Sequence, residues 1–598
     1  MKAIINIITQ FIAVIKRFPL TMACAGIATG IGIYHINYRP EDDNLPLVYT
    51  ALTCWLGLTL FFSIQLFCES KSYSSVNKWL LYAVGLVLLV LYRLFLINEL
   101  EQIETTRYIL FNLGLHLLAS FAPFVGSSNI SAFWQYNEAL FIRFLTATLY
   151  SVVLYIGIAG ALLAIDNLFS VTIKGELYGT VWYLIAGIFN TAFFLVDVPH
   201  TATINEQKPY PKGLKLFTQF VLLPLVSLYL LILYGYLTKI IVTWNLPLGW
   251  VSYLIIAFSV CGIFALLLIY PIRNNDENRW IKTFSKAFYI AIVPLIGLLF
   301  VAIFYRVHQY GVTELRYYVL LLAFWLLGMA IYFLTSKTYT IKVIPVSLAL
   351  LCFSSSFGPW GAFSVARNSQ INTLEQLLIT NKLLVNGKVV KTTNTISKAD
   401  NYQITSIINY LDKTHGFSYL QPWFTQNLDS VLPDKRRYSY HEQGDKIHEL
   451  LGVKAEYDNE YNKSTRAKYF YYQSRFGNLV INTLGFNSIL DFSCNTHEQQ
   501  YNISSTENLT LKSDTEELTL KDKSNKIIGQ LNLLETYNTL TPLITNKNRE
   551  INDLPLDSIR FSLNTDKTIL LQLKSMSGTI ENDRIKIDQI EGYLLFKK

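Results

Sequence analysis

Charged residues are scarce in this sequence of 598 residues. Asp, Glu, Lys and Arg make up 15% of the chain, whereas apolar residues make up 52% and the mean hydropathy is +0.32. Soluble domains carry roughly 25% charged residues, so these values argue against a soluble globular enzyme and exclude a disordered chain. The six cysteines are too few to form a disulfide scaffold in so long a chain.

Sequence motifs of common catalytic sites are missing as well. The chain contains no GxxxxGK[ST] phosphate loop, no GxGxxG turn after a strand and no GxSxG elbow. His–Glu dipeptides begin at His441, His448 and His497, but none has the second histidine one helical turn later that a zinc-protease helix requires. We therefore expect no metal and no cofactor, and the sequence predicts no catalytic residue.

Long apolar runs, separated by short polar loops, fill the chain up to residue 357. A hydrocarbon core about 30 Å thick needs about 20 helical residues to cross it, and lipid leaves no other way to pair the backbone within one segment. These runs predict a polytopic α-helical bundle of about eleven membrane spans. The predicted spans are 18–36, 46–67, 79–98, 107–125, 139–165, 177–197, 215–241, 250–271, 285–305, 315–335 and 341–357.

Four regions follow from these patterns. Residues 1–17 place their polar side chains on one helical face, which predicts an amphipathic helix on the membrane surface. Residues 18–357 form the transmembrane domain, residues 358–385 form a connecting segment and helix, and residues 386–598 form a soluble domain. Within the first span, Gly26 and Gly30 lie on one face, and we expect them to allow close helix packing inside the subunit rather than dimerisation.

Lysine and arginine in the predicted loops indicate the orientation. With the N-terminus inside, fourteen of them fall in inner loops and six in outer loops. Because cytoplasmic loops carry the excess of Lys and Arg, this count places the N-terminus in the cytoplasm. An odd number of spans then places the soluble domain outside it. Residues 1–367 also hold all of the net charge of +8, which fits membrane topology better than a nucleic-acid surface.

The soluble domain reads as an α+β fold with a mainly antiparallel sheet. Ile404, Ile407, Ile408 and Leu411 have the spacing of a helix with one buried face, and Ser397 with Asp400 has the spacing of a capping box before it. Later segments alternate between apolar and polar residues, as a half-buried strand does. These alternating pairs include Leu518 with Leu520, Leu531 with Leu533, and Ile569 with Leu571 and Leu573.

Polar and ionisable residues at membrane depth are costly, so each is a candidate functional residue. Asp166 follows a long apolar run at the predicted outer end of its span, and the loop at 306–316 is the densest polar cluster beside the membrane. This cluster would either dock the soluble domain or form a substrate site. The candidate residues are Asp166, Asn190, Arg306, His308, Glu314 and Arg316.

A second, acidic site is an alternative. Polytopic glycosyltransferases that use lipid-linked sugars keep acidic residues in their first outer loop, where a carboxylate acts as a base or binds a metal. Here that loop contains Glu41, Asp42 and Asp43. The loop is about ten residues long, which leaves little room for an acceptor.

Several stretches resemble a bacterial membrane family that is catalogued as domain of unknown function 4153. They include "ELYGTVWYLIAGIFNTAFFL" at 176–195, "YRVHQYGVTELRYYVLLLAFWL" at 305–326 and "SSFGPWGAFSVARNSQINTLEQLL" at 355–378. The most specific parts are 187–190, 306–316 and 358–362. The resemblance implies a polytopic protein of the bacterial envelope, and it supplies no activity, cofactor or site residue.

We therefore expect a multi-pass protein of the bacterial inner membrane that contacts the lipid bilayer and binds no nucleic acid. One class of function is to move or sense a solute, a lipid or an envelope partner through the polar residues near the outer face. The alternatives are an envelope enzyme that uses the acidic first outer loop and a structural envelope scaffold. The sequence does not indicate the oligomeric state.

Overall fold

The structure is a computed structural model in which the chain divides into two compact units, Met1–Glu456 and Tyr457–Lys598. Each unit is described by itself. The described residues are 2–38, 45–97, 101–169, 172–200, 210–243, 250–274, 278–336, 338–390, 396–433, 442–455, 468–473, 483–495, 499–502, 508–513, 517–522, 526–545, 558–564, 566, 568–581 and 584–597. Residues 396–433 and 442–455, which the sequence assigned to the soluble domain, thus belong to the first unit.

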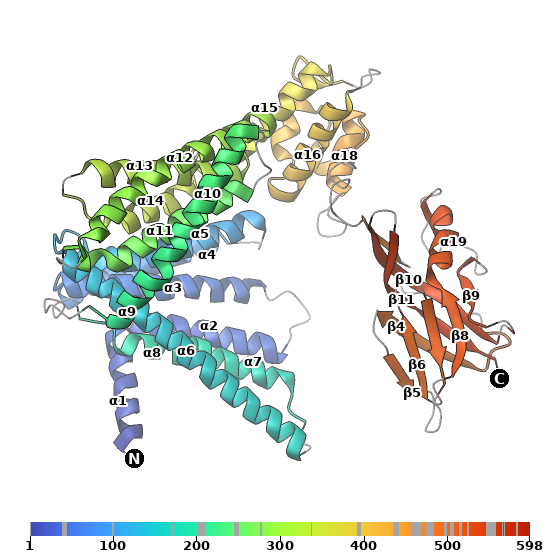
Figure 1. Cartoon of the computed structure of the whole chain (residues 1–598), viewed down its shortest axis with the longest axis horizontal. Helices are drawn as coiled ribbons and strands as arrows, with labels where there is room; N and C mark the ends of the chain where they lie inside the picture. Colours follow the sequence, from blue (N-terminus) through green and yellow to red (C-terminus); the bar gives the residue numbers. More distant parts are fainter. Residues whose placement is uncertain are drawn as a thin grey trace. The chain divides into compact units, whose positions relative to one another are not determined.

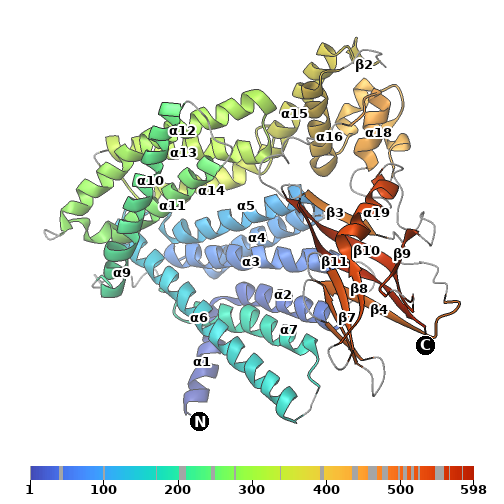
Figure 2. The ribbon, with the colours of Figure 1, turned by 45° about the vertical axis from the view of Figure 1, so that its right-hand side comes forward.

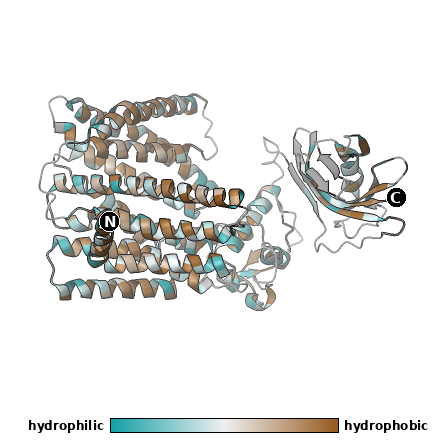
Figure 3. Cartoon of the chain, turned by 90° about the horizontal axis from the view of Figure 1, so that it is seen from below, coloured by the Kyte–Doolittle hydropathy of each residue, from teal (hydrophilic) through white to brown (hydrophobic). Residues whose placement is uncertain are grey.

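Apolar helices make up most of the first unit (Figure 1). Within the described residues, nine helices are long and apolar enough to cross a membrane. They are α2 (Pro19–Tyr38), α3 (Leu45–Ser70), α4 (Ser75–Phe95), α6 (Ile130–Phe169), α7 to α8 (Gly175–Val196), α9 to α10 (Lys212–Thr243), α11 (Trp250–Ile269, with η5 at Tyr270–Asn274), α12 (Trp280–Tyr310) and α13 (Glu314–Thr335). Figure 3 shows hydrophobic residues along most of their length. The predicted membrane bundle is confirmed.

The other two predicted spans are helices that fall outside this set. They are α5 (Gln102–Phe121) and α14 (Val343–Ser355). With 13 residues, α14 is about 20 Å long, which is shorter than the hydrocarbon core. The two helices pack against each other, with the rings of Phe111 and Phe353 5.6 Å apart. The predicted count of about eleven is therefore approximate.

Two of the spans contain a π-helical turn. One is η2 (Leu184–Phe189), between α7 (Gly175–Tyr183) and α8 (Asn190–Val196), and the other is η4 (Thr218–Leu222), between α9 (Lys212–Phe217) and α10 (Leu223–Thr243). Gly187, in η2, faces Thr29 of α2 so closely that an added Cβ would overlap its hydroxyl. The glycine is needed there because the two helices touch at this point.

The first helix, α1 (Lys2–Arg17), runs across the direction of α2 and α3 in both Figure 1 and Figure 2. Its apolar side chains are largely exposed, including Ile5 at 56%, Ile7 at 65% and Ile8 at 53%. An exposed isoleucine face on a helix that lies crosswise to the spans is what an amphipathic helix in the membrane surface needs.

The expectation for Gly26 and Gly30 was wrong. A Cβ added to either glycine would meet nothing within 4 Å in the structure. The close approach on α2 is made instead by Gly32, which lies against the ring of Tyr183. A four-residue glycine spacing thus marked the right helix but the wrong face.

A helical region follows the last span. It consists of α15 (Ala362–Thr380), a short hairpin of β1 (Leu384–Val385) and β2 (Lys388–Val389), α16 (Lys398–Thr414), η7 (Ser418–Trp423), α17 (Leu428–Val431) and α18 (Glu442–Leu451). The predicted helical face on α16 is confirmed, because Ile404, Ile407, Ile408 and Leu411 are at most 3% exposed. The cap is confirmed too, since Ser397 Oγ accepts from the amide of Asp400 at 3.1 Å. These side chains share one core with α15.

The second unit is built from two antiparallel sheets, which confirms the predicted sheet type. In one sheet the order is β3 (Lys468–Gln473), β10 (Ile569–Glu581), β11 (Arg584–Phe596) and β4 (Ser488–Asn495), with β9 (Arg560–Ser562) beside β10. In the other it is β5 (Gln499–Asn502), β6 (Asn508–Ser513), β7 (Glu517–Lys521) and β8 (Ile527–Asn532). The alternating residues Leu518, Leu520, Leu571 and Leu573 are fully buried. A helix, α19 (Leu533–Thr545), interrupts the strands and was not predicted.

Candidate functional site: a buried joint at the 310–316 loop

A buried carboxylate at the start of α13 joins the membrane helices to the helical region. Glu314 is 7% exposed, and its Oε1 accepts from the hydroxyl of Tyr410 at 2.7 Å. The same oxygen lies 2.9 Å from Nε2 of His415, whose side chain is 3% exposed. Because Glu314 is in the first turn of α13, the exposed amide groups of the helix N-terminus also favour its negative charge. Both partners come from the segment that contains α16.

Side chains of α15 hold the backbone of the same loop. The side-chain amide of Gln370 donates to the carbonyls of Tyr310 and Val312 at 2.9 and 3.0 Å. Ser369 Oγ accepts from the amide of Val312 at 2.8 Å. Between them, Gly311 has a φ of +70°, and an added Cβ would lie 2.9 Å from Gln370 Nε2, so glycine fits both the backbone angle and the space.

The four charged or titratable candidates around this loop have different surroundings. Arg316 donates through Nη1 to the carbonyl of Gly311 at 2.7 Å and lies over the ring of Tyr310. Arg306 is half-buried on α12, and His308 is exposed in its last turn. Glu314 and Arg316 therefore hold the loop itself, whereas Arg306 and His308 flank it.

The remaining candidates are elsewhere. Asp166 is near the end of α6, where its Oδ1 accepts from the amide of Ile173 at 3.2 Å and so closes the connection to α7. Figures 1 and 2 both place the end of α6 at the opposite edge of the bundle from α12 and α13. Asn190 is half-buried at the first position of α8, directly after the π-helical turn. The structure does not gather the six candidates into one site. Glu41, Asp42 and Asp43 lie outside the described residues.

The chemistry of the joint is that of a hydrogen-bonded contact. Burial, together with the negative charge of Glu314, raises the pKa of the Tyr410 hydroxyl far above its usual range, so Tyr410 keeps its proton and donates. A carboxylate that accepts two buried hydrogen bonds is strongly held, and without it Tyr410 and His415 would keep only their contact with each other, at 3.1 Å. Among the described residues no group of three potential metal-ligating side chains occurs, here or elsewhere.

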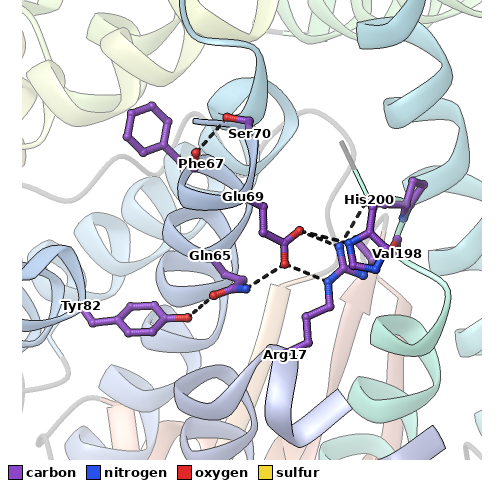
Figure 4. A network of polar contacts seen from close by, with 9 residues as sticks. Arg17, Gln65, Phe67, Glu69, Ser70, Tyr82, Val198 and His200 are labelled. Carbon is purple, nitrogen blue, oxygen red and sulfur yellow. Dashed lines mark hydrogen bonds and ion pairs between the residues drawn. The ribbon is translucent and has the colours of Figure 1, made fainter. Parts of the chain in front are cut away.

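A second polar network, which the sequence analysis did not find, joins α1 to α3 (Figure 4). Arg17 makes two parallel bonds to Glu69, Nε to Oε1 at 2.9 Å and Nη2 to Oε2 at 2.8 Å. Gln65 donates to Glu69 at 2.8 Å, and Tyr82 donates to Gln65 at 2.6 Å. Arg17 also donates to the carbonyl of Val198 at 2.6 Å.

This network had a weak signal in the sequence. Gln65 and Glu69 are one helical turn apart at the polar end of an otherwise apolar run, and Arg17 ends the amphipathic helix on the same predicted side. In the sequence, Arg17 is predicted only as a polar residue of the amphipathic face and as a topological charge. The network fixes the end of the surface helix against α3.

Comparisons with known proteins identify a family and no activity. An uncharacterized protein of Pasteurella multocida (strain Pm70) is 29% identical over 194 residues, which cover 32% of this chain and 32% of that protein. This chain thus matches about a third of that relative's length. No solved structure matches the chain. The family model described as "Domain of unknown function (DUF4153)" matches residues 23–384, from α2 to the β1–β2 hairpin. The chain therefore belongs to the DUF4153 family of membrane proteins.

Proposed function

We propose that this protein is a sensor of the bacterial inner membrane, in which the helical region 362–455 binds an extracytoplasmic solute, lipid or envelope partner. The proposal includes a cytoplasmic N-terminus and an exported helical region and β-sheet unit, as the lysine and arginine count favours. The observation that carries it is the buried joint between Glu314, Tyr410 and His415. Through this joint, a change in the helical region would reach α12 and α13.

A polar groove beside the joint supports this proposal. It is shallow and open, because all of its lining residues except Pro359 belong to the single helix α15, and they include Asn368, Asn372 and Gln376. Ser369 also lines the groove, and its hydroxyl accepts from the amide of Val312 in the loop. A ligand that bonds to Ser369 would therefore compete directly with the loop.

The lining indicates the kind of ligand. Amide and hydroxyl side chains without a charge pair well with the hydroxyl groups of sugars or the amide groups of peptides. Sensing is favoured over movement of a solute because Asp166 and Asn190 lie apart from the joint. A solute path that used all the candidate residues would need them in one place.

The test uses a deletion strain and plasmid-borne variants, with growth under osmotic and detergent stress as the readout. Glu314→Gln and Ser369→Ala should fail to restore the deletion phenotype at wild-type membrane levels. Ser364→Ala, on the same helix but outside the groove, is the matched control and should restore it. Full restoration by the first two variants would contradict the proposal. Loss of activity only in proportion to lost protein would favour the scaffold alternative.

A further inference from the structure

A small cavity is present at the other end of the bundle, where α11 ends and α12 begins. Its volume is about 30 Å³, enough for two or three water molecules or for part of a phosphate group. The polar part of its lining comes from Arg273, Lys282 and Ser285, its rings come from Tyr270, Tyr289, Phe333 and Tyr339, and the rest of its lining is aliphatic. Cationic and hydroxyl groups thus meet at one opening among aromatic side chains.

Arg273 is held in a fixed orientation by two of these rings. Its guanidinium carbon lies 3.7 Å from the ring centroid of Tyr270 and 4.8 Å from that of Tyr339. The two rings are inclined by 69° to each other with centroids 6.4 Å apart, so they contact the guanidinium from two adjacent directions and do not cover both of its faces. Nη1 of Arg273 is buried, yet it has no hydrogen-bond partner among the described residues. A buried donor of this kind is costly unless a ligand pairs with it.

The two charged residues in the described lining of the cavity, Arg273 and Lys282, are both cationic. From Tyr210 to Thr313 the described residues include no Asp or Glu, and the stretch between Glu206 and Glu314 contains only two carboxylates, Asp276 and Glu277, which are outside the described residues. Lys286 follows Lys282 by one helical turn. In addition, both lysines are near the N-terminus of α12, the positive end of its dipole.

We propose that this cavity binds a phosphate group, with Arg273 as the fork-shaped donor and Lys282 as the second cation. A guanidinium edge pairs with two phosphate oxygens, and a lysine nearby adds a point charge. Basic pockets between membrane helices on the cytoplasmic side hold anionic headgroups in this way. The site is at the end of the apolar segment Val251–Arg273, and tyrosines such as those beside it are enriched at membrane interfaces.

A lipid headgroup and a soluble phosphate share this chemistry, and the experiment separates them. The full-length protein, purified in a neutral detergent, is heated with added phosphatidylglycerol, phosphatidylcholine or inorganic phosphate, and its apparent unfolding temperature is recorded. A ligand that binds the folded state raises that temperature in proportion to occupancy. Native mass spectrometry of the same samples counts bound lipids.

Phosphatidylglycerol should stabilise the protein and phosphatidylcholine should not. In Arg273→Gln, the lipid concentration needed for the same stabilisation should rise roughly ten- to hundredfold, which is the range expected for the loss of charge-assisted hydrogen bonds. Arg273→Lys keeps the charge but loses the fork-shaped pair of donors. Its stabilisation by phosphatidylglycerol should therefore lie between that of the wild type and that of Arg273→Gln, and it provides a test even if Arg273→Gln folds poorly. Lys239→Gln removes a lysine at the end of another span, outside the cavity lining, and should leave the effect unchanged.

Stabilisation by inorganic phosphate that depends on Arg273 would support the site and identify a soluble ligand. Stabilisation by phosphatidylglycerol alone would support the site and identify a lipid. The proposal is overturned if neither probe raises the unfolding temperature, or if both probes raise it equally in the wild type and in Arg273→Gln.

Discussion

Glu314 and His415 are 101 positions apart in the chain, and their side chains meet at 2.9 Å. One residue begins a membrane helix and the other directly follows α16. Because the contact is buried, neither side chain can exchange its partner for water at low cost. This pair fixes where the helical region attaches to the bundle, and the account of sensing depends on it.

Removing this carboxylate should loosen the helical region. Glu314→Ala leaves His415 and Tyr410 buried without their partner, and breaking a buried pair in this way costs about 3–5 kcal/mol. Hydrogen exchange of the α16 amides, measured on the full-length protein in detergent, should become faster. Asp429→Ala, on the exposed surface of α17, is the control. Unchanged exchange in Glu314→Ala would show that the joint does not hold α16.

The Arg17–Glu69 pair should show energetic coupling. The two side chains are 15% and 19% exposed and share two parallel bonds. In a double-mutant cycle with Arg17→Gln and Glu69→Gln, we expect a coupling energy of about 1–3 kcal/mol, because each single change leaves a mostly buried group unpaired. Thermal unfolding of the solubilised protein supplies the values.

The exposed pair of Lys446 and Glu449 gives a reference for that cycle. These side chains are 33% and 67% exposed, so their coupling should not exceed about 0.5 kcal/mol. If the Arg17–Glu69 cycle gives no more than this reference, the network in Figure 4 contributes little to holding the surface helix.

Gly187 should not tolerate alanine. The added methyl group would overlap the hydroxyl of Thr29, which is buried on α2. Overpacking of this kind costs about 1–3 kcal/mol, so Gly187→Ala should lower the unfolding temperature. Gly160→Ala, in a helix with open space around the glycine, should be neutral or slightly stabilising.

A second change tests the cause of that loss. Thr29→Ala removes the hydroxyl that the methyl group would meet, so it should restore part of the stability of Gly187→Ala. If the double variant is as unstable as the sum of the two single variants, the clash is not the reason that glycine is needed.

His448 should make the helical region sensitive to acid. It is 4% exposed, and neither ring nitrogen has a hydrogen-bond partner among the described residues. Burial lowers the pKa of His448 below its usual value of 6.5, although the charge of Asp445 opposes this shift. Below about pH 6.5 the unfolded chain therefore takes up a proton that the folded chain does not. As the pH is lowered, the free energy of unfolding decreases by at most about 1.4 kcal/mol per pH unit.

The measurement compares unfolding between pH 7.5 and 5.5 in the wild type and in His448→Phe. The variant should lose less stability over this range, because it has no buried imidazole to protonate. His35→Phe, at an exposed histidine on α2, should keep the wild-type slope. An equal slope in all three proteins would contradict the prediction.

Patterns that repeat along the chain predicted the fold well. Apolar runs of bilayer length, the spacing of Ile404 and Ile408, and the alternation of Leu571 and Leu573 each reflect burial of a whole element. The helix α19 was missed because Leu533 continues the alternation of Leu531, although Leu533, Tyr537 and Leu540 have the spacing of a helix and share the core with the sheet.

Only one side of the joint, the one that contains Glu314, could be predicted from the sequence. The cluster around Glu314 was found because a carboxylate beside a membrane span is unusual. Its partners, Tyr410 and His415, could not be found, since nothing in their local pattern says which distant residue they touch. The same limit applies to Arg273, whose stacking on Tyr339 brings together residues from two separate loops.

The orientation of the chain decides which compartment each site faces. Alkaline phosphatase, which is active outside the cytoplasm, and a green fluorescent protein, which folds inside it, can each be fused after Lys598 and expressed in cells. The account predicts an active phosphatase and a dark fluorescent fusion; with α5 and α14 counted among eleven crossings, Glu314 and His415 are then outside and Arg273 is inside. A fluorescent fusion with an inactive phosphatase would contradict it.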